Sequence, residues 1–173
     1  MTGSGPNGTA AAGDFDLVPL RIEDAPALAG LHQRCMGAGE GWSEAGLWRL
    51  LTAEAGRGVQ ALAHVAGSPD PRPVAFILAF AAADEAEILA FCVAPEHRRL
   101  GLGTRLLTRL MGELAAAGTA RLYLEVRASN FAARQVYARA GLAEAGRRKG
   151  YYPTTDGATR EDAVVLARRL LEG

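Results

Sequence analysis

The run from Glu87 to Gly118 constrains this chain more than any other part of it. An apolar stretch, a loop containing proline and two glycines two residues apart lead into a long segment with apolar residues at helical spacing. The loop reads Arg98-Arg99-Leu100-Gly101-Leu102-Gly103-Thr104. Such a turn leaves backbone N–H groups uncovered at the positive end of a helix dipole, which favours a pyrophosphate or a similar anion. The sequence therefore predicts an anion site at a helix N-terminus, with Arg98 as a charged fork for phosphate oxygens.

A pyrophosphate site is one of several structures that such a glycine pair can form. Turn chemistry alone can place two glycines at the start of a helix. A dinucleotide-binding loop of the Rossmann type needs a third glycine at position 106, where this chain has Leu106. A Walker loop needs Gly-Lys followed by Ser or Thr, and the chain contains no such run. A pyrophosphate loop and plain turn chemistry therefore remain.

Hydrophobic periodicity and turn residues predict an alternation of strands and helices. The predicted strands cover residues 16–20, 59–66, 74–81, 86–93, 121–126, 142–149 and 163–169. The predicted helices cover residues 24–36, a segment after Ser43, 102–117 and 130–141. Asp24 and Ser43 are the expected N-caps of the first two helices, and Tyr151-Tyr152-Pro153 is expected in a loop. This order predicts an α/β fold, a mixed sheet of about seven strands with helices on both faces.

Composition limits the partners and the compartment. The 173 residues include 19 Lys plus Arg and 19 Asp plus Glu, so no overall field favours nucleic acid or an anionic membrane. No apolar stretch reaches the roughly 20 residues that cross a bilayer. We expect one domain over residues 14–173, after a disordered Gly/Ser/Ala leader over 1–13 that lacks the marks of a secretory signal. Cys35 and Cys92 fit no metal pattern and are expected to be reduced thiols of a cytoplasmic protein.

Glu125 is the side chain whose position most suggests chemistry. Strand alternation puts Leu124 and Val126 on one face and Glu125 and Arg127 on the other. A carboxylate within such a strand requires a charged partner or a catalytic purpose. A salt bridge to Arg127 or another arginine is one interpretation, and proton transfer is the other. Tyr137 raises the same question, since it is either a packing residue or a proton donor.

The segment Arg98–Thr104 closely resembles the pyrophosphate loop of the GNAT superfamily of N-acetyltransferases. The resemblance extends over about residues 16–169 and implies the GNAT fold, with acetyl-CoA as the co-substrate and no metal. Four further segments look like the RimI branch, which acetylates the N-terminal alanine of a small-subunit ribosomal protein. They are Trp42-Ser43-Glu44, Leu124–Asn130 followed by Tyr137-x-x-x-Gly141-Leu142, Arg148–Thr154 and Arg160–Ala163. Arg98 stands where that branch often has glutamine.

The resemblance also implies roles for individual residues. Glu125 is the implied proton acceptor and Tyr137 the implied proton donor. The implied acetyl-CoA contacts are Phe91, Cys92, Val93, Arg98, Arg99, Leu100, Gly101, Leu102, Gly103, Thr104 and Asn130. Asn130 can instead cap the helix that it begins. Trp42, Tyr151 and Tyr152 are expected to line the groove for a protein N-terminus. A small amine or antibiotic as acceptor, and a non-catalytic acyl-CoA-binding protein, are the alternative functions.

Overall fold

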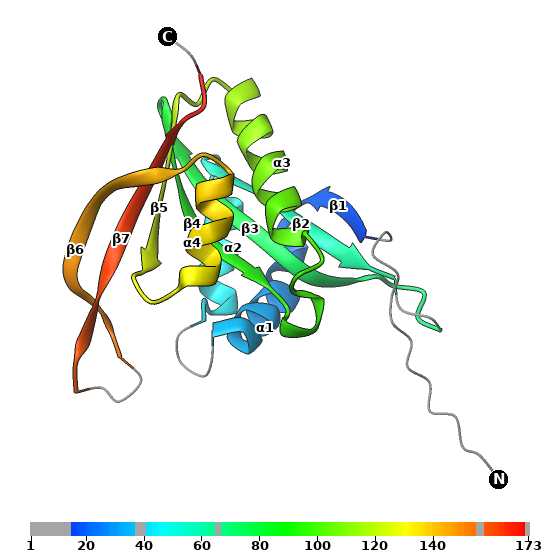
Figure 1. Ribbon diagram of the computed structural model, residues 1–173. Helices are drawn as coiled ribbons and strands as arrows, with labels where there is room; N and C mark the ends of the chain where they lie inside the picture. Colours follow the sequence, from blue (N-terminus) through cyan, green and yellow to red (C-terminus); the bar gives the residue numbers. More distant parts are fainter. Residues whose placement is uncertain (1–14, 37–40, 65–66, 155–157, 172–173) are drawn as a thin grey trace.

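The computed structural model describes residues 15–36, 41–64, 67–154 and 158–171, and the predicted leader over 1–13 lies outside them (Figure 1). One seven-stranded sheet, in the order β1-β2-β3-β4-β5-β7-β6, runs through the molecule. Its strands are β1 (Phe15–Pro19), β2 (Gly56–Ala63), β3 (Arg72–Ala82), β4 (Glu85–Val93), β5 (Arg121–Arg127), β6 (Ala143–Pro153) and β7 (Arg160–Arg169). The helices are α1 (Ala25–Met36), α2 (Glu44–Thr52), α3 (Leu102–Ala116) and α4 (Phe131–Arg139). Two short 3-10 turns, Ile22–Asp24 and Pro95–His97, precede α1 and α3.

Two apolar clusters fix the helices to opposite faces of the sheet. The larger joins α3 and Tyr137 of α4 to β2, β3, β4, β5 and β7. The smaller joins α1 and α2 to the other face of β3 and β4. α3 contributes a stripe at the spacing that the sequence predicts: Leu102, Leu106, Leu107, Leu110, Met111 and Leu114, all buried. The predicted mixed sheet with helices on both faces is confirmed.

The sheet opens between β4 and β5. These parallel strands pair from Glu85–Arg121 to Ile88–Leu124 and stop there, although both continue. At the same level β4 contains a bulge: Leu78 pairs with Ala90 and Ala79 with Ile88, which leaves Leu89 as the extra residue. The unpaired ends of β4 and β5 separate beyond this bulge, as Figure 1 shows. The opening exposes backbone groups in the middle of a sheet, where they are otherwise paired.

The caps and helix ends mostly follow local sequence rules. The Ser43 hydroxyl accepts from the Gly46 N–H at 3.1 Å, and the Asn130 side chain accepts from the Ala133 N–H at 3.1 Å. Gly118, in the left-handed region at φ 90°, follows α3 as expected. The predicted cap at Asp24 is wrong. Its carboxylate accepts instead from the Arg21 N–H and the Gln60 side chain, both at 2.7 Å.

The prediction of a loop at Tyr151–Pro153 is also wrong, because β6 extends through Pro153. The pairing of β6 with β7 is interrupted between Arg148–Ala163 and Tyr152–Glu161, where three residues of β6 face Asp162 alone. Gly150, at φ 55°, lies inside this bulge. The bulge disturbs the two-residue alternation by which a strand is recognised in sequence.

Candidate active site

The loop before α3 presents backbone donors. Gly101, at φ 77°, is the N-cap of α3 and offers no side-chain cap. The first helical bond runs from the Arg105 N–H to the Gly101 carbonyl, so the N–H groups of Leu102, Gly103 and Thr104 have no helical acceptor. Arg99, at φ 66°, is a second left-handed residue in the same loop. A Cβ at Gly103 would lie 3.6 Å from the Phe91 ring, so the loop lies close to β4.

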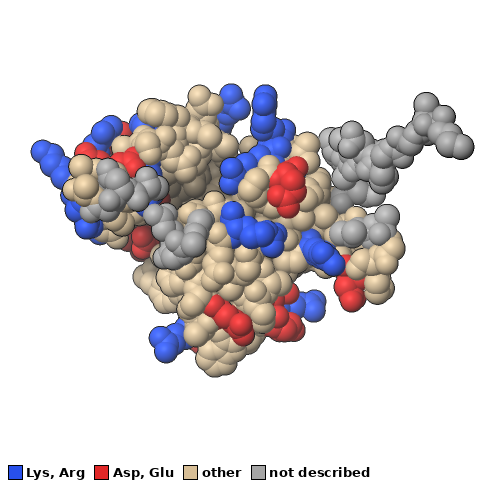
Figure 2. All heavy atoms as spheres, turned by 90° about the horizontal axis from the view of Figure 1, so that it is seen from below, with Lys and Arg blue, Asp and Glu red and all other residues tan. Residues whose placement is uncertain are grey.

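The loop contains two exposed arginines, Arg98 and Arg99. Arg98 donates from Nε to the Val93 carbonyl at 3.2 Å, which joins the loop to the end of β4. Figure 2 views the molecule from the side where the loop before α3 lies in Figure 1, and Lys and Arg side chains gather over the middle of that face. The unpaired N–H groups and this charge together fit a phosphorylated ligand.

The bulge at Leu89 sorts the side chains of β4 between the two faces. Ile88 belongs to the α3 cluster, whereas Ala90 and Cys92 belong to the α1 and α2 cluster. Phe91 and Val93 then point back to the α3 side. Cys92 is 6% exposed, and its contact to the Cys35 thiol together with burial raises its pKa. Cys92 is therefore a protonated thiol directed away from the loop before α3.

Glu125 lies where β5 has lost its pairing with β4. Its side chain is 15% exposed, and its Oε1 accepts from Arg148 Nε at 2.8 Å. The salt bridge that the sequence suggested therefore exists, but its partner is Arg148 of β6. Arg148 is 59% exposed in its side chain and also lies over the Tyr151 ring at 5.2 Å. An exposed arginine can leave a carboxylate at small cost, since such pairs are weak in water.

Tyr137 lies on the opposite face of the sheet from Glu125. It is 7% exposed, packs in the α3 cluster and has its ring centroid 6.0 Å from that of Phe91. Burial, with a smaller contribution from Tyr152, raises the pKa of Tyr137. The phenol therefore stays protonated at neutral pH. Glu125 and Tyr137 thus lie on opposite faces of the sheet, Glu125 on the unpaired part of β5 and Tyr137 against Phe91 on the unpaired part of β4.

Tyr151 and Tyr152 project from the bulge of β6. Their rings meet edge to face with centroids 5.0 Å apart, and the Arg127 guanidinium lies 4.6 Å from the centroid of the Tyr152 ring. Burial and then the Glu125 carboxylate raise the pKa of Tyr152. Tyr152 in turn contributes to the raised pKa of Tyr137, so it interacts electrostatically with both Glu125 and Tyr137.

Trp42 is fixed to β4 from the α1 side. Its Nε1 donates to the carbonyl of Leu89, the bulge residue, at 3.1 Å, and its backbone N–H donates to Nδ1 of His32 at 2.8 Å. His32 is 2% exposed, and burial lowers its pKa. Neither the bulge at Leu89 nor the hydrogen bond that His32 accepts can be predicted from the sequence, because both depend on contacts between segments far apart in the chain.

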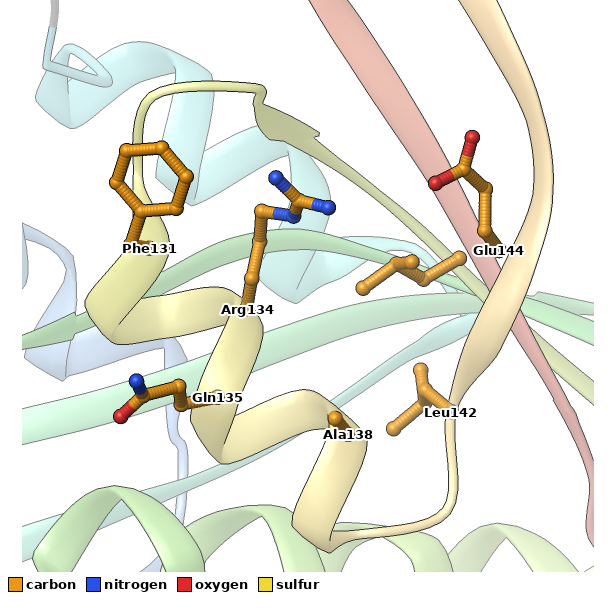
Figure 3. Close-up of a pocket in the computed structure, with 7 residues that line it drawn as sticks. Phe131, Arg134, Gln135, Ala138, Leu142 and Glu144 are labelled. Atoms are coloured by element: carbon orange, nitrogen blue, oxygen red, sulfur yellow. The ribbon is translucent and has the colours of Figure 1, made fainter.

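A separate hollow of about 390 Å³ lies between α4 and β6 (Figure 3). Its lining side chains are Phe131, Arg134, Gln135, Ala138, Leu142, Glu144 and Leu166. It contains neither Glu125 nor Tyr137, so size alone does not identify the chemical centre. The β4–β5 gap, which the predicted catalytic residues flank, is the candidate active site.

Comparisons with known proteins identify the family of this chain. Residues 25–142 match the profile of the acetyltransferase (GNAT) family. The chain belongs to the GNAT acetyltransferase family. The ribosomal protein bS18-alanine N-acetyltransferase of Escherichia coli K12 is 38% identical over 148 residues, which cover 86% of this chain and 93% of that protein.

Solved structures of GNAT proteins have the same fold. The crystal structure of the ribosomal-protein-S18-alanine N-acetyltransferase from Escherichia coli matches with a TM-score of 0.80 at 35% identity, over 92% of this chain and 96% of that one. NAA60 of Arabidopsis thaliana, solved in complex with acetyl-CoA, matches with a TM-score of 0.75 at 16% identity, over 90% and 99%.

GNAT acetyltransferases use acetyl-CoA as co-substrate, and the residues of this chain fit that molecule. The unpaired N–H groups of Leu102, Gly103 and Thr104 suit its pyrophosphate, and the unpaired end of β4 suits its amide-bearing arm. Within the described part of the chain, no group of His, Cys, Asp or Glu is placed to hold a metal ion. A search of the same residues finds no helix with the length and apolarity of a membrane span.

Proposed function

We propose that this chain transfers the acetyl group of acetyl-CoA to the α-amine of an N-terminal alanine of a small-subunit ribosomal protein. The observation that carries the proposal is the placement of Glu125 and Tyr137 on the two sides of the β4–β5 gap. The near full-length similarity to ribosomal protein bS18-alanine N-acetyltransferase supports this acceptor. A ribosomal acceptor places the reaction in the cytoplasm.

The acyl donor is proposed to bind on the α3 side. The loop Arg98–Thr104 holds the pyrophosphate, and the backbone of Phe91, Cys92 and Val93 pairs with the amide-bearing arm as an added strand would. A backbone N–H near Val93 polarises the thioester carbonyl. Asn130 caps α4 through its Oδ1, and a contact of its amide with acetyl-CoA is compatible with that bond.

Glu125 is proposed to accept the proton of the amine. An N-terminal amine has a pKa of about 7.7 to 8, so most of it is protonated at neutral pH and cannot attack a thioester. The Glu125 carboxylate, on the α1 side of the gap, takes that proton directly or through one water. The Arg148 guanidinium must then move away from Glu125 so that the amine can approach the carboxylate, and its exposure permits this movement. Trp42, Tyr151 and Tyr152 surround the first residue of the acceptor.

Tyr137 is proposed to protonate the departing sulfur. A CoA thiolate resembles that of cysteine, whose pKa is about 8.5, so a nearby protonated phenol helps it to leave. The raised pKa of Tyr137 keeps that proton available. The acetyl group passes directly to the amine: the C–N bond forms, the thioester C–S bond breaks, and Tyr137 gives its proton to the sulfur. The proton that Glu125 accepts passes to solvent, and the second proton that the nitrogen loses after the attack restores Tyr137 through solvent. The Cys92 thiol takes no part in the transfer, since it is directed toward α1 and α2.

The proposal is tested by measuring CoA release with peptides that differ only in their first residue. One peptide begins with a free alanine and the start of the ribosomal protein, and its matched control has a blocked α-amine and a free lysine. We expect turnover of the free alanine peptide alone. Turnover of the lysine peptide or of small free amines would show that the acceptor is not the N-terminal alanine. Binding of acetyl-CoA without turnover of any amine would indicate a non-catalytic protein.

A further inference from the structure

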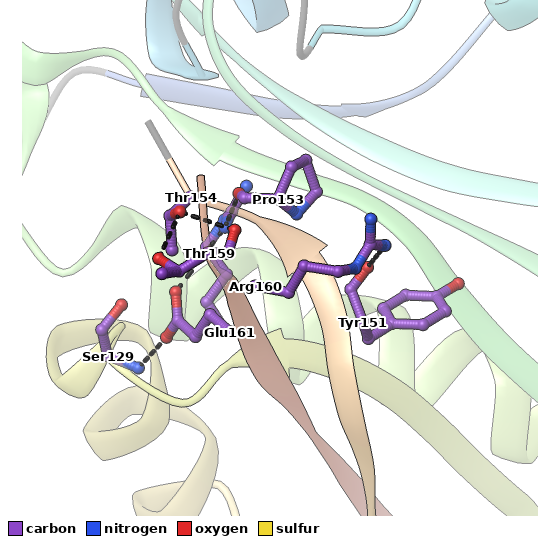
Figure 4. A network of polar contacts seen from close by, with 8 residues as sticks. Ser129, Tyr151, Pro153, Thr154, Thr159, Arg160 and Glu161 are labelled. Atoms are coloured by element: carbon purple, nitrogen blue, oxygen red, sulfur yellow. Dashed lines mark hydrogen bonds and ion pairs between the residues drawn. The ribbon is translucent and has the colours of Figure 1, made fainter. Parts of the chain in front are cut away.

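Three consecutive residues of β7, Arg160, Glu161 and Asp162, form polar contacts in and around the bulge of β6, and Figure 4 shows those of Arg160 and Glu161. The Asp162 carboxylate accepts from the Gly150 N–H at 2.9 Å. The Arg160 guanidinium donates from Nε to the Gly150 carbonyl at 2.5 Å and from a terminal nitrogen to the Tyr151 carbonyl at 2.6 Å. Residues 160 and 162 share one face of the strand, so together they bind the backbone N–H and the backbone carbonyl of Gly150.

These bonds satisfy backbone groups that the bulge removes from the β6–β7 ladder. Three residues of β6 face one residue of β7, so strand pairing cannot serve all their N–H and carbonyl groups. Charged side chains replace that pairing, and hydrogen bonds to charged groups are stronger than those between neutral groups. The direction in which Tyr151 and Tyr152 leave the strand is set by these bonds.

Glu161 connects the bulge to the catalytic helix. Its Oε1 accepts from the Ser129 N–H at 2.5 Å, one residue before the Asn130 cap of α4, as the dashed contact in Figure 4 shows. Its Oε2 lies 3.6 Å from the Arg127 guanidinium, which covers the Tyr152 ring and donates to the Pro153 carbonyl at 2.9 Å. α4 carries Tyr137. The three residues therefore fix the tyrosine pair relative to the helix of the proposed proton donor.

We propose that Arg160, Glu161 and Asp162 form a clamp of positioning residues that sets the acceptor-binding geometry of Tyr151 and Tyr152. This inference rests on the proposed function, because it concerns the acceptor half of the same site. The hydrogen bonds and the ion pair of the clamp described above involve neither Glu125 nor the loop before α3. Its loss should therefore weaken acceptor binding and leave acetyl-CoA binding unchanged.

The test compares Michaelis constants for the alanine peptide and for acetyl-CoA. Arg160→Ala should raise the KM for the peptide about 10-fold, with the KM for acetyl-CoA within about twofold of its original value. Asp162→Ala should act in the same direction, and Asp162→Asn should restore the peptide KM, because its amide oxygen can still accept from Gly150. Arg169→Ala is the matched control, since Arg169 is an exposed arginine at the far end of β7.

Equal increases in both Michaelis constants, or the same effect from Arg169→Ala, would overturn the clamp. If Arg160→Ala does not fold, Arg160→Lys serves instead, because it keeps the charge but lacks the fork that reaches two carbonyls. Failure of the wild-type chain to turn over the peptide would refute the proposed function. The clamp is then judged by hydrogen exchange at Gly150, which must be faster in Asp162→Ala and unchanged in Asp162→Asn; slow exchange in both would refute it.

Discussion

The proposed acyl-donor half of the site consists mainly of backbone atoms of one continuous stretch, whereas the proposed acceptor half consists of side chains of separate elements. The donor half uses the end of β4 and the N–H groups that open α3. The acceptor half is assigned to Trp42, which is bonded to the bulge of β4, and to Glu125, Arg148 and Tyr152 of β5 and β6. A backbone site depends on chain conformation, and a side-chain site depends on residue identity and long-range contacts.

This difference indicates where each property of the enzyme resides. The donor is common to the family, and conformation alone is enough to recognise its pyrophosphate. The acceptor half can change by substitution without disturbing the sheet, because Arg148 and Tyr151 are exposed. Substitutions in the two halves should therefore separate binding of the two substrates.

The largest effect is expected from Glu125→Gln, which keeps the shape of the side chain and removes its basicity. Loss of a general base should lower kcat by about 10²- to 10⁴-fold, while the Kd of acetyl-CoA stays unchanged. Steady-state turnover of the alanine peptide and calorimetric titration of acetyl-CoA measure the two quantities. Tyr123→Phe, two residues earlier on the same face of β5, is the control and should retain turnover. Near-normal turnover of Glu125→Gln would remove Glu125 as the base.

The donor half should respond to a change of conformation rather than of chemistry. Gly101 has φ 77°, and a Cβ at this position would meet no atom within 4 Å, so Gly101→Ala introduces backbone strain alone. A strain of about 1 to 2 kcal/mol should raise the Kd of acetyl-CoA about 10-fold and leave the peptide KM unchanged. Gly112→Ala, in the interior of α3, is the control: it should stabilise the fold by up to about 1 kcal/mol without changing that Kd. An unchanged Kd in Gly101→Ala would show that the loop does not hold the donor.

The sequence predicts the donor half well for the same physical reason. The glycine pair, the apolar stripe of α3 and the left-handed Gly118 are local signals, and the predicted helix over 102–117 agrees with Leu102–Ala116 to within one residue. The roles of Arg99 to Thr104 in binding acetyl-CoA remain predictions. Their positions follow from a few neighbouring residues.

The acceptor half is predicted only in part because its geometry depends on distant contacts. Alternation places Glu125 on the correct face of β5, yet it cannot identify Arg148 of β6 as the partner. Asp24 bonds to Gln60 of β2, so a local capping rule misassigns it. The bulges at Leu89 and Gly150 break strand periodicity at the two places that shape the gap. The long apolar run of β4 does not indicate the bulge at Leu89.

A moderate effect is expected from Trp42→Phe, which removes the Nε1 donor from the Leu89 carbonyl at the bulge. The carbonyl loses one hydrogen bond, so the peptide KM should rise about threefold to tenfold. The KM of acetyl-CoA should stay constant. Trp48→Phe is the matched control, because Trp48 is 52% exposed on α2. Equal effects of the two substitutions would mean that the bond to Leu89 has no part in acceptor binding.

The smallest expected effect is a pH dependence of stability, which comes from the hydrogen bond between Trp42 and His32 of α1. Burial lowers the pKa of His32 from 6.5, so below pH 6.5 the unfolded chain binds a proton that the folded chain resists. The contribution of neutral His32 to the free energy of unfolding is therefore complete above pH 6.5. It declines as the pH falls, since protonated Nδ1 can no longer accept from the Trp42 N–H. His32→Asn keeps an acceptor and does not titrate, so its melting temperature should match wild type at pH 8 and exceed it at pH 5. His32→Gln places its amide oxygen elsewhere and should melt lower at both pH values. An identical decline on acidification in wild type and His32→Asn would show that His32 does not control this contact.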